Sequence, residues 1–104
     1  MVRQTELTLE ELKELLVGAP DSCRQGHRIL PTGLLVNEIG VLFLDKNADA
    51  EGTLRDLLED PRESVRWISW KYLTRGTPVS PETTAALAAF RENPQNDAIV
   101  SGYA

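Results

Sequence analysis

Cysteine and histidine are almost absent from this sequence of 104 residues, which holds one of each, Cys23 and His27. A single thiol cannot form an intramolecular disulfide, and zinc sites built on several thiolates are excluded as well. The missing disulfide framework favours a reducing compartment, so we expect a cytoplasmic protein. Cys23 and His27 lie four residues apart and would share a helix face, but two ligands do not make a metal site. We therefore assign no catalytic residue, metal or cofactor, and the interpretation leans away from an enzyme.

Long apolar runs and an excess of positive charge are also missing. The longest mainly apolar stretch, from Leu34 to Leu44, contains Glu38 and is too short to span a bilayer, and residues 1–6 lack the apolar segment of a signal peptide. We therefore expect a soluble protein with no membrane contact. Acidic side chains outnumber basic ones by 16 to 11, for a net charge of -5. Because nonspecific nucleic-acid binding depends on neutralising phosphates, this charge makes a nucleic-acid partner unlikely.

The remaining composition is that of a folded globular protein. Hydrophobic residues make up 41% of the chain and charged residues 26%, and the length suits one domain, which we place at residues 1–104. The periodicity of the apolar residues predicts an all-α fold, a small bundle of about five helices. The last residues, 95–104, are expected to form a short helical turn or a loose tail.

In the first half of the chain the pattern predicts two helices. Thr8 and Glu11 form a capping box that opens a helix over 9–17, and Gly18 ends it. Residues 19–32 show no sustained period and are predicted to be mostly loop. Residues 33–46 are apolar around most of the circumference, which favours a central helix, although a hairpin of two strands remains the alternative.

In the second half, Asp60-Pro61 is the strongest signal, because it closes one amphipathic segment and opens another. We predict a polar connection over 47–52, a helix opened by Thr53, and a second helix over 61–74. Ser80 as a cap followed by Pro81 predicts a last helix over 81–92. Together the helices on either side of Asp60-Pro61 form a helical hairpin.

The residues of this hairpin resemble one HEAT repeat over 54–73. The pattern consists of Leu54, Leu57 and Leu58, the Asp60-Pro61 turn, the Val65-Arg66 pair, Ser69 and Leu73. Displaced by 33 positions, Leu87, Phe90 and Asn93-Pro94 repeat part of it. The resemblance implies a stacked array of helical hairpins that serves protein contacts, and it implies no particular reaction.

The helix over 61–74 has two apolar sides. Val65, Ile68, Ser69, Tyr72 and Leu73 share one side, and the opposite side combines Glu63, Trp67 and Trp70 with the flanking Arg66 and Lys71. Aromatic residues bordered by cations are enriched at binding hot spots. The alternative is structural: a neighbouring helix, either 33–46 or 81–92, covers the tryptophans. The HEAT resemblance likewise implies that Arg66 ties adjacent hairpins together.

We interpret the protein as an interaction or adaptor module that binds another protein through Glu63, Arg66, Trp67, Trp70 and Lys71. The alternative is a ligand-binding protein or enzyme with a pocket beside Trp67 and Trp70. A third reading is a nucleic-acid binder, through Arg62, Arg66, Lys71 and Arg75.

Two further patterns lead to predictions. Asp45, Asn47, Asp49 and Asp56 have some of the spacing of a calcium-binding EF-hand loop, but Ala50 replaces the turn glycine, so we expect a solvated loop that does not bind calcium. The helix over 81–92 is broadly apolar. A homodimer through this helix, near Leu87 and Phe90, would bury that surface.

Overall fold

The computed structural model describes residues 7–19, 24–25, 28–29, 31–75 and 78–101. Its elements are α1 (Leu9–Val17), β1 (Arg24–Gln25), β2 (Arg28–Ile29), α2 (Pro31–Leu44), α3 (Ala48–Leu57), α4 (Glu63–Leu73), α5 (Pro81–Glu92), the 3-10 helix η1 (Pro94–Asn96) and α6 (Asp97–Val100). β1 and β2 form a two-residue antiparallel pair. The predicted all-α fold is confirmed. None of the helices in the described segments is long and apolar enough to cross a membrane.

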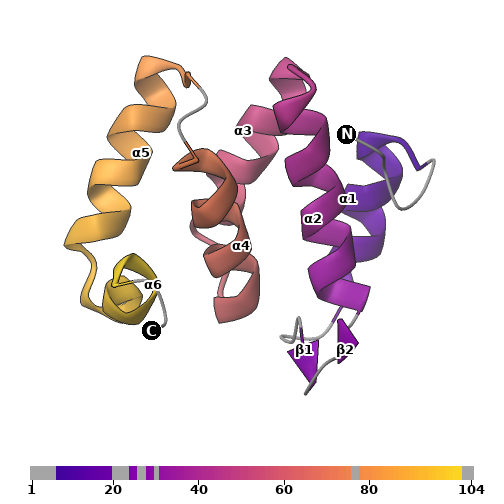
Figure 1. Ribbon diagram of the computed structural model, residues 1–104, viewed down its shortest axis with the longest axis horizontal. Coiled ribbons are helices and arrows are strands. Elements are labelled where there is room, and N and C mark those ends of the chain that lie inside the picture. The colour runs from indigo at the N-terminus through magenta and orange to yellow at the C-terminus, as the bar shows by residue number, and fades with distance from the viewer. Residues whose placement is uncertain (1–6, 20–23, 26–27, 30, 76–77, 102–104) are drawn as a thin grey trace.

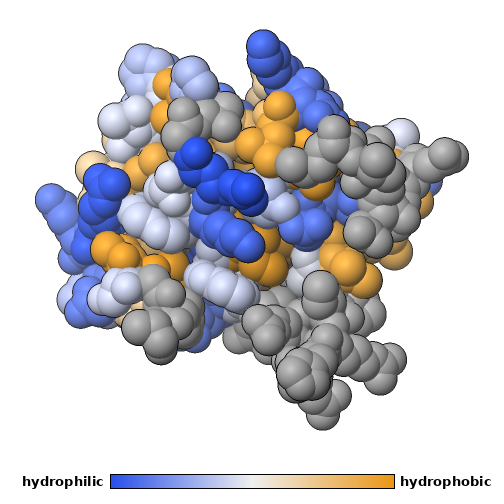
Figure 2. Space-filling view, in the orientation of Figure 1, coloured by the Kyte–Doolittle hydropathy of each residue, from blue (hydrophilic) through white to orange (hydrophobic). Residues whose placement is uncertain are grey.

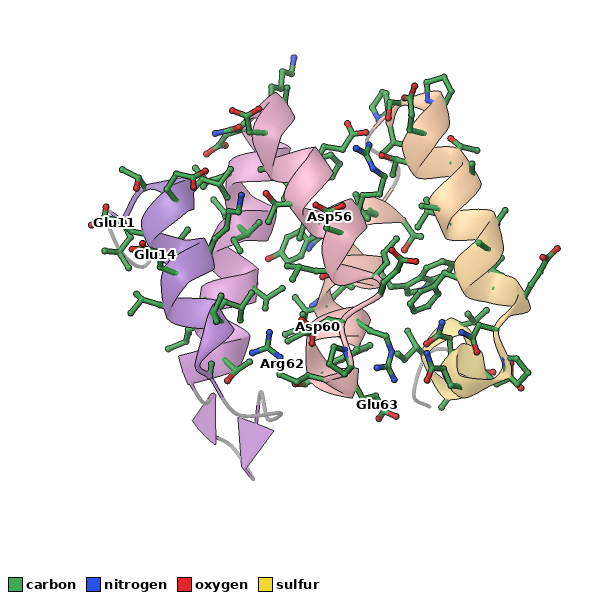
Figure 3. All side chains as sticks on the ribbon, turned by 180° about the vertical axis from the view of Figure 1, so that it is seen from behind. Glu11, Glu14, Asp56, Asp60, Arg62 and Glu63 are labelled. Atoms are coloured by element: carbon green, nitrogen blue, oxygen red, sulfur yellow. The ribbon has the colours of Figure 1, made fainter. Side chains whose placement is uncertain are left out.

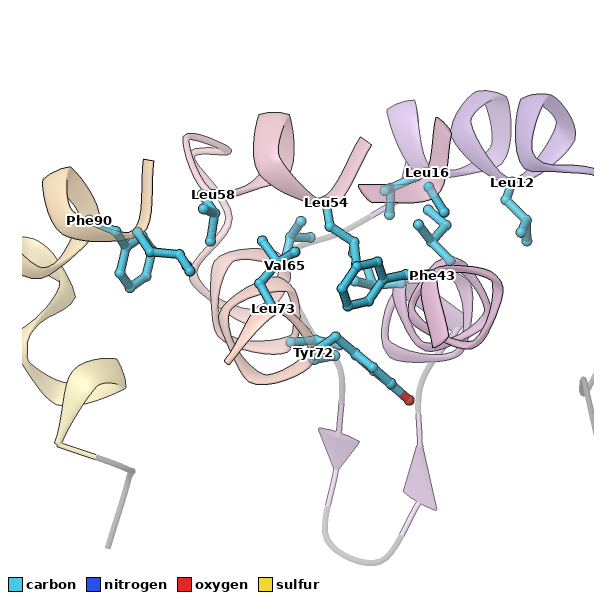
Figure 4. Close-up of a cluster of buried hydrophobic side chains, with 14 of the residues drawn as sticks. Leu12, Leu16, Phe43, Leu54, Leu58, Val65, Tyr72, Leu73 and Phe90 are labelled. Carbon is cyan, nitrogen blue, oxygen red and sulfur yellow. The ribbon is translucent and has the colours of Figure 1, made fainter. Parts of the chain in front are cut away.

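The helices form two layers. Viewed along the helices, α1, α3 and α5 form one row, and α2, α4 and α6 form the other (Figure 4). In the broad view, α2 and α4 lie in front of α1 and α3, and α5 stands at the far side of α4 (Figure 1). Because α3 and α4 are joined by a short turn, they form the central hairpin, and α1 and α5 lie on either side of α3. This arrangement leaves each layer with one broad outer face.

The core lies between the two layers. Leu12 and Leu16 of α1, Leu54 of α3 and Phe90 of α5 meet residues of α2, α4 and α6 there (Figure 4). The predicted inward set of α4 is confirmed, since all five of its members are buried. Ile99 of α6 is 2% exposed, so the C-terminal segment contributes to the core. Burial of this apolar surface is the main favourable term in folding.

Residues 31–44 form the helix α2, so the predicted helix is confirmed and the strand hairpin is wrong. Val36, Ile39, Val41 and Phe43 are all buried, as expected for a helix packed on several sides. Gly40 allows the ring of Tyr72 to lie directly against the α2 backbone, where any Cβ would overlap the ring. The close contact between α2 and α4 therefore explains the glycine at this position.

The connection from α2 to α3 is shorter than predicted. Lys46 adopts a left-handed conformation with φ of 69°, and its N–H donates to Phe43 O while that of Asn47 donates to Leu42 O. The Asn47 side chain then accepts hydrogen bonds from the N–H groups of Asp49 and Ala50. The helix therefore opens at Ala48, and the prediction that Thr53 opens it is wrong. Because Asn47 is a stronger cap than a threonine and Ala50 is fully buried, the earlier start is favoured.

The predicted starts of the first and last long helices are confirmed. Thr8 and Glu11 form the capping box of α1, and the Ser80 side chain accepts from the N–H of Thr83 at the start of α5. α4 begins at Glu63, two residues later than predicted, after the N-cap Arg62. α5 is anchored to α3 by Glu51, whose carboxylate accepts from the Ser80 and Thr83 hydroxyls at 2.8 and 2.6 Å. These hydrogen bonds lower the pKa of Glu51, that from Thr83 being the largest cause.

Candidate partner-binding surface

The outer side of α4 carries three residues spaced four apart, Glu63, Trp67 and Lys71. Together with Arg75, which lies two residues beyond the end of the helix, we name them the α4 stripe. Glu63, Lys71 and Arg75 are exposed, and Trp67 is half-buried where it packs against the edge of the core. Figure 2 shows hydrophilic side chains over α4 in the centre of this face. An aromatic ring bordered by a carboxylate and two cations is therefore present at the surface.

Trp70, by contrast, packs against the neighbouring helix. Its ring stacks on that of Phe90 in α5 with centroids 4.8 Å apart and an interplanar angle of 13°. The guanidinium of Arg91 lies 5.2 Å from the centroid of the Trp70 ring. The structural alternative therefore holds in part for Trp70: α5 packs on its ring, although Trp70 as a whole is half-buried, as Trp67 is. The role of Trp70 is to hold α5 against α4.

Arg66 is a structural residue and not a surface contact, because it is only 5% exposed. Its Nη1 donates to the carbonyl oxygens of Asp60 and Pro61 at 2.8 and 3.0 Å, and its Nε donates to Asn96 Oδ1 at 3.1 Å. The Asn96 Nδ2 in turn donates to Phe90 O. Arg66 thus links the α3–α4 turn to the segment after α5, and its assignment as a partner-binding residue is wrong.

Arg62 makes the corresponding link on the other side. Its guanidinium pairs with the Asp60 carboxylate at 2.8 Å and donates to the carbonyl oxygens of Leu16 and Ala19 at the end of α1. Figure 3 shows Asp60 and Arg62 close together at the foot of α4. The bonds from Arg62 lower the pKa of Asp60. Arg62 and Arg66 therefore connect the α3–α4 turn to two segments that are distant in sequence, the end of α1 and the segment after α5.

This result removes two of the four cations from the nucleic-acid reading. The guanidinium groups of Arg62 and Arg66 donate hydrogen bonds within the protein. Lys71 and Arg75 are the exposed members of that set. Arg75 also lies over the Tyr72 ring, with 5.4 Å from its guanidinium carbon to the ring centroid. Two exposed cations on a chain of net charge -5 make a weak phosphate-binding surface.

Tyr72 links α4 to α2 within the layer formed by α2, α4 and α6. The Tyr72 hydroxyl donates to Asn37 Oδ1, which ties α4 to α2. Burial raises the pKa of Tyr72 above its ordinary value, and the nearby Glu38 adds to the rise while Arg75 opposes it. The phenol therefore stays protonated and acts as a donor. Its place beside Gly40 was not predicted, since helix periodicity does not pair positions on different helices.

Only Asp45 and Asn47 of the EF-hand-like pattern lie in the connection between α2 and α3. Asn47 is a helix cap, and Asp49 and Asp56 lie on α3 itself. The described residues contain no group of three or more histidine, cysteine or carboxylate side chains that could hold a metal ion. Cys23 and His27 lie outside the described residues, so the structure does not test their proximity.

Two of the grooves that the described residues form lie on the face of α1, α3 and α5. The larger, about 510 Å³, runs between α3 and α5 and is mainly polar, and neither Trp67 nor Trp70 lines it. The smaller, about 190 Å³, is mainly apolar, and we name it the α1–α3 groove; Lys13, Leu16, Val17, Asp56 and Leu57 are among its lining residues. The sequence analysis missed this groove. The residue that could have indicated it is Val17, an aliphatic side chain that does not lie on the buried side of α1.

Leu87 and Phe90, which we expected near a dimer interface, are 8% and 4% exposed within the single chain. They cover the core and Trp70, so they are not available to a second copy. The outer side of α5 instead presents Thr84, Ala85 and Ala88. Any dimer through this helix would therefore use small side chains.

Comparisons with protein-family models, with curated proteins and with solved structures found no match to this chain. Its function must be inferred from its own residues.

Proposed function

We propose that the protein is an interaction module that binds another protein through the α4 stripe. The observation that carries this proposal is that Trp67 is half-buried on α4, one turn from the exposed Glu63 and one turn from the exposed Lys71. Trp70 is half-buried as well, but its ring stacks on Phe90 and so holds α5. A rigid aromatic side chain that is already partly ordered loses little conformational entropy when a partner covers it.

The charges near Trp67 differ in sign between the two ends of α4. Glu63 stands at the N-terminal end of α4, and Lys71 and Arg75 stand at the other end. A partner with the opposite order of charges would be oriented along α4, because complementary charges fix register and suppress wrong partners. The two-layer stack supports this role by holding α4 rigidly against α2 and α3.

A photo-crosslinking experiment in the native host tests the proposal. Benzoylphenylalanine in place of Lys71 should capture one partner, and the same group in place of Thr84, on the outer side of α5, should not. Adding Trp67→Ala to the Lys71 crosslinker variant should abolish capture. Equal capture from both positions, or capture that survives Trp67→Ala, would contradict a specific α4 surface.

The homodimer remains a second proposal, now restricted to the alanine side of α5. Light scattering on the wild type and on an Ala85→Glu, Ala88→Glu variant tests it, because both side chains are exposed and the fold should tolerate the change. A dimeric wild type that becomes monomeric in the variant would support the proposal. A monomeric wild type, or a variant of unchanged mass, would refute it.

A further inference from the structure

The three helical segments at the C-terminal end, α5, η1 and α6, contribute a small part of the core. Of the fifteen described residues in the buried core cluster, three belong to these segments: Leu87, Phe90 and Ile99. The other twelve lie in α1–α4 and in the turn after α3. α2 packs against α1, α3 and α4, whereas α5 meets the earlier helices chiefly at α3. The first four helices would therefore keep most of the core if the C-terminal segments moved away.

A groove separates α5 from α3 along part of their length. It holds about 510 Å³ and is mainly polar, with Arg55 and Asp56 on the side of α3 and Asn93 and Gln95 on the other side. Asp56, Asn93 and Gln95 are exposed. Because these polar side chains already face water, moving the two helices apart there brings little new apolar surface into contact with solvent.

The C-terminal segments have hydrogen bonds of their own. The Asn96 Nδ2 donates to Phe90 O at 3.1 Å, and the N–H of Asn96 donates to Asn93 O at 2.9 Å. The Asn93 side chain accepts from the N–H of Gln95 at 3.1 Å. Figure 1 shows α5 and α6 together at one edge of the molecule. Since these bonds join the last turn of α5 to η1, which leads directly into α6, the three segments form one unit.

At the start of α5, this unit is held to α3 by a single carboxylate oxygen. The Glu51 Oε2 accepts from the N–H of Ser80 at 3.0 Å and from the hydroxyls of Ser80 and Thr83 at 2.8 and 2.6 Å. The Arg55 Nη1 also donates to Thr83 Oγ1 at 3.2 Å. Hydrogen bonds to an ionised acceptor are stronger than those between neutral groups, so the charge of Glu51 contributes much of this attachment.

At the other end, the unit is held by Arg66 and Trp70 of α4. The Arg66 Nε donates to Asn96 Oδ1 at 3.1 Å, and the Trp70 ring stacks on that of Phe90. Arg66 also donates to two carbonyl oxygens of the α3–α4 turn, and these bonds lie wholly outside the C-terminal unit. The attachment of the unit is thus confined to a few groups near its two ends.

We propose that α5, η1 and α6 form a cover that opens from α1–α4 as one unit, and that the Glu51 carboxylate is the latch that holds it closed. Opening separates Phe90 from Trp70 and bares one face of the indole ring on α4. Trp70 lies one helical turn from Trp67, so the open form presents two aromatic rings side by side. The proposal does not depend on a partner at the α4 stripe, because opening is a property of the chain alone.

Native-state hydrogen exchange of the full chain at low guanidinium chloride, followed by NMR, tests the cover. We expect the slowest amides of α5 and the amide of Asn96 to exchange at least about tenfold faster than the slowest amides of α2 and α4. The amides of the cover should share one dependence on denaturant, because a unit that opens together exposes the same surface. Fraying of single turns would instead give exchange that hardly depends on denaturant.

Glu51→Gln tests the latch, because it removes the charge and keeps the size of the side chain. It should speed the exchange of the α5 amides about fivefold or more and that of the α2 amides less than about twofold. The matched control is Asp49→Asn, an equal charge change at an exposed residue in the same first turn of α3, and it should change exchange in α5 less than about twofold.

Three results would overturn the proposal. In the wild type, the slowest amides of α5 could exchange no faster than those of α2 and α4, as they would in a single cooperative unit. The amides of α5 and Asn96 could differ in their dependence on denaturant, which would mean that they open separately. Glu51→Gln and Asp49→Asn could speed exchange in α5 equally. The first two results come from the wild type, so they stand even if a variant fails to fold.

Discussion

Arg66 offers the sharpest test of how the stack is held together. Its three hydrogen bonds, two to carbonyl oxygens of the α3–α4 turn and one to Asn96, join that turn to the segment after α5. Arg66→Met keeps much of the aliphatic volume but removes every donor. The acceptors then remain in a largely buried environment without this partner, which costs more than the loss of a surface contact.

The expected cost follows from these contacts. A hydrogen bond with a charged partner contributes on the order of 1.5–3 kcal/mol, and bonds made by one side chain are not additive. We therefore expect Arg66→Met to lower the free energy of unfolding by about 3–5 kcal/mol, a large part of the roughly 5–15 kcal/mol that is typical of a whole domain. Arg66→Lys should fall between methionine and the wild type, because an ammonium cannot reproduce the planar fork.

Guanidinium chloride unfolding followed by circular dichroism measures the effect. The matched control is Arg75→Met, which removes an exposed arginine that lies over the Tyr72 ring, and it should cost less than about 1 kcal/mol. If the two substitutions had equal costs, Arg66 would not be the link between the turns, and its burial would need another explanation.

Three further outcomes are expected. Gly40→Ala should lower the unfolding midpoint, because its Cβ would overlap the buried Tyr72 ring, whereas Gly18→Ala, which meets no atom within 4 Å, should be nearly neutral. Stability should fall as the pH drops below about 4, since the pKa of Asp60 is lowered in the folded state and protonation breaks its pair with Arg62; Asp60→Asn should flatten that part of the pH curve of unfolding free energy, and an unchanged curve would contradict the pairing. In acrylamide quenching, Trp70→Phe should increase the mean accessibility of the remaining indole fluorescence, because Trp70 is the tryptophan stacked on Phe90, and a decrease would reverse the assignment.

Local signals were sufficient for much of the helical structure. The capping box at Thr8 and the Ser80 cap are each complete within four residues, and the structure bears out both. The inward side of α4 was likewise readable, because helical periodicity alone places its buried residues on one side. The start of α3 was missed where two caps competed, Asn47 and Thr53, and the burial of Ala50 favoured the earlier one.

The roles of individual side chains depended on the tertiary structure. Periodicity assigns Trp67 and Trp70 to the same side of α4, and only the position of α5 separates them, since Phe90 stacks on one of the two. Arg62 and Arg66 both belong to the cationic set that the sequence offers for nucleic acid, yet each also donates to a distant acceptor, 46 and 30 residues away. The sequence by itself determined where helices form, because caps and periodicity act over a few neighbouring residues. The packing of the two layers decided which side chains support the fold and which remain available to a partner, because those contacts join positions that are distant in the chain.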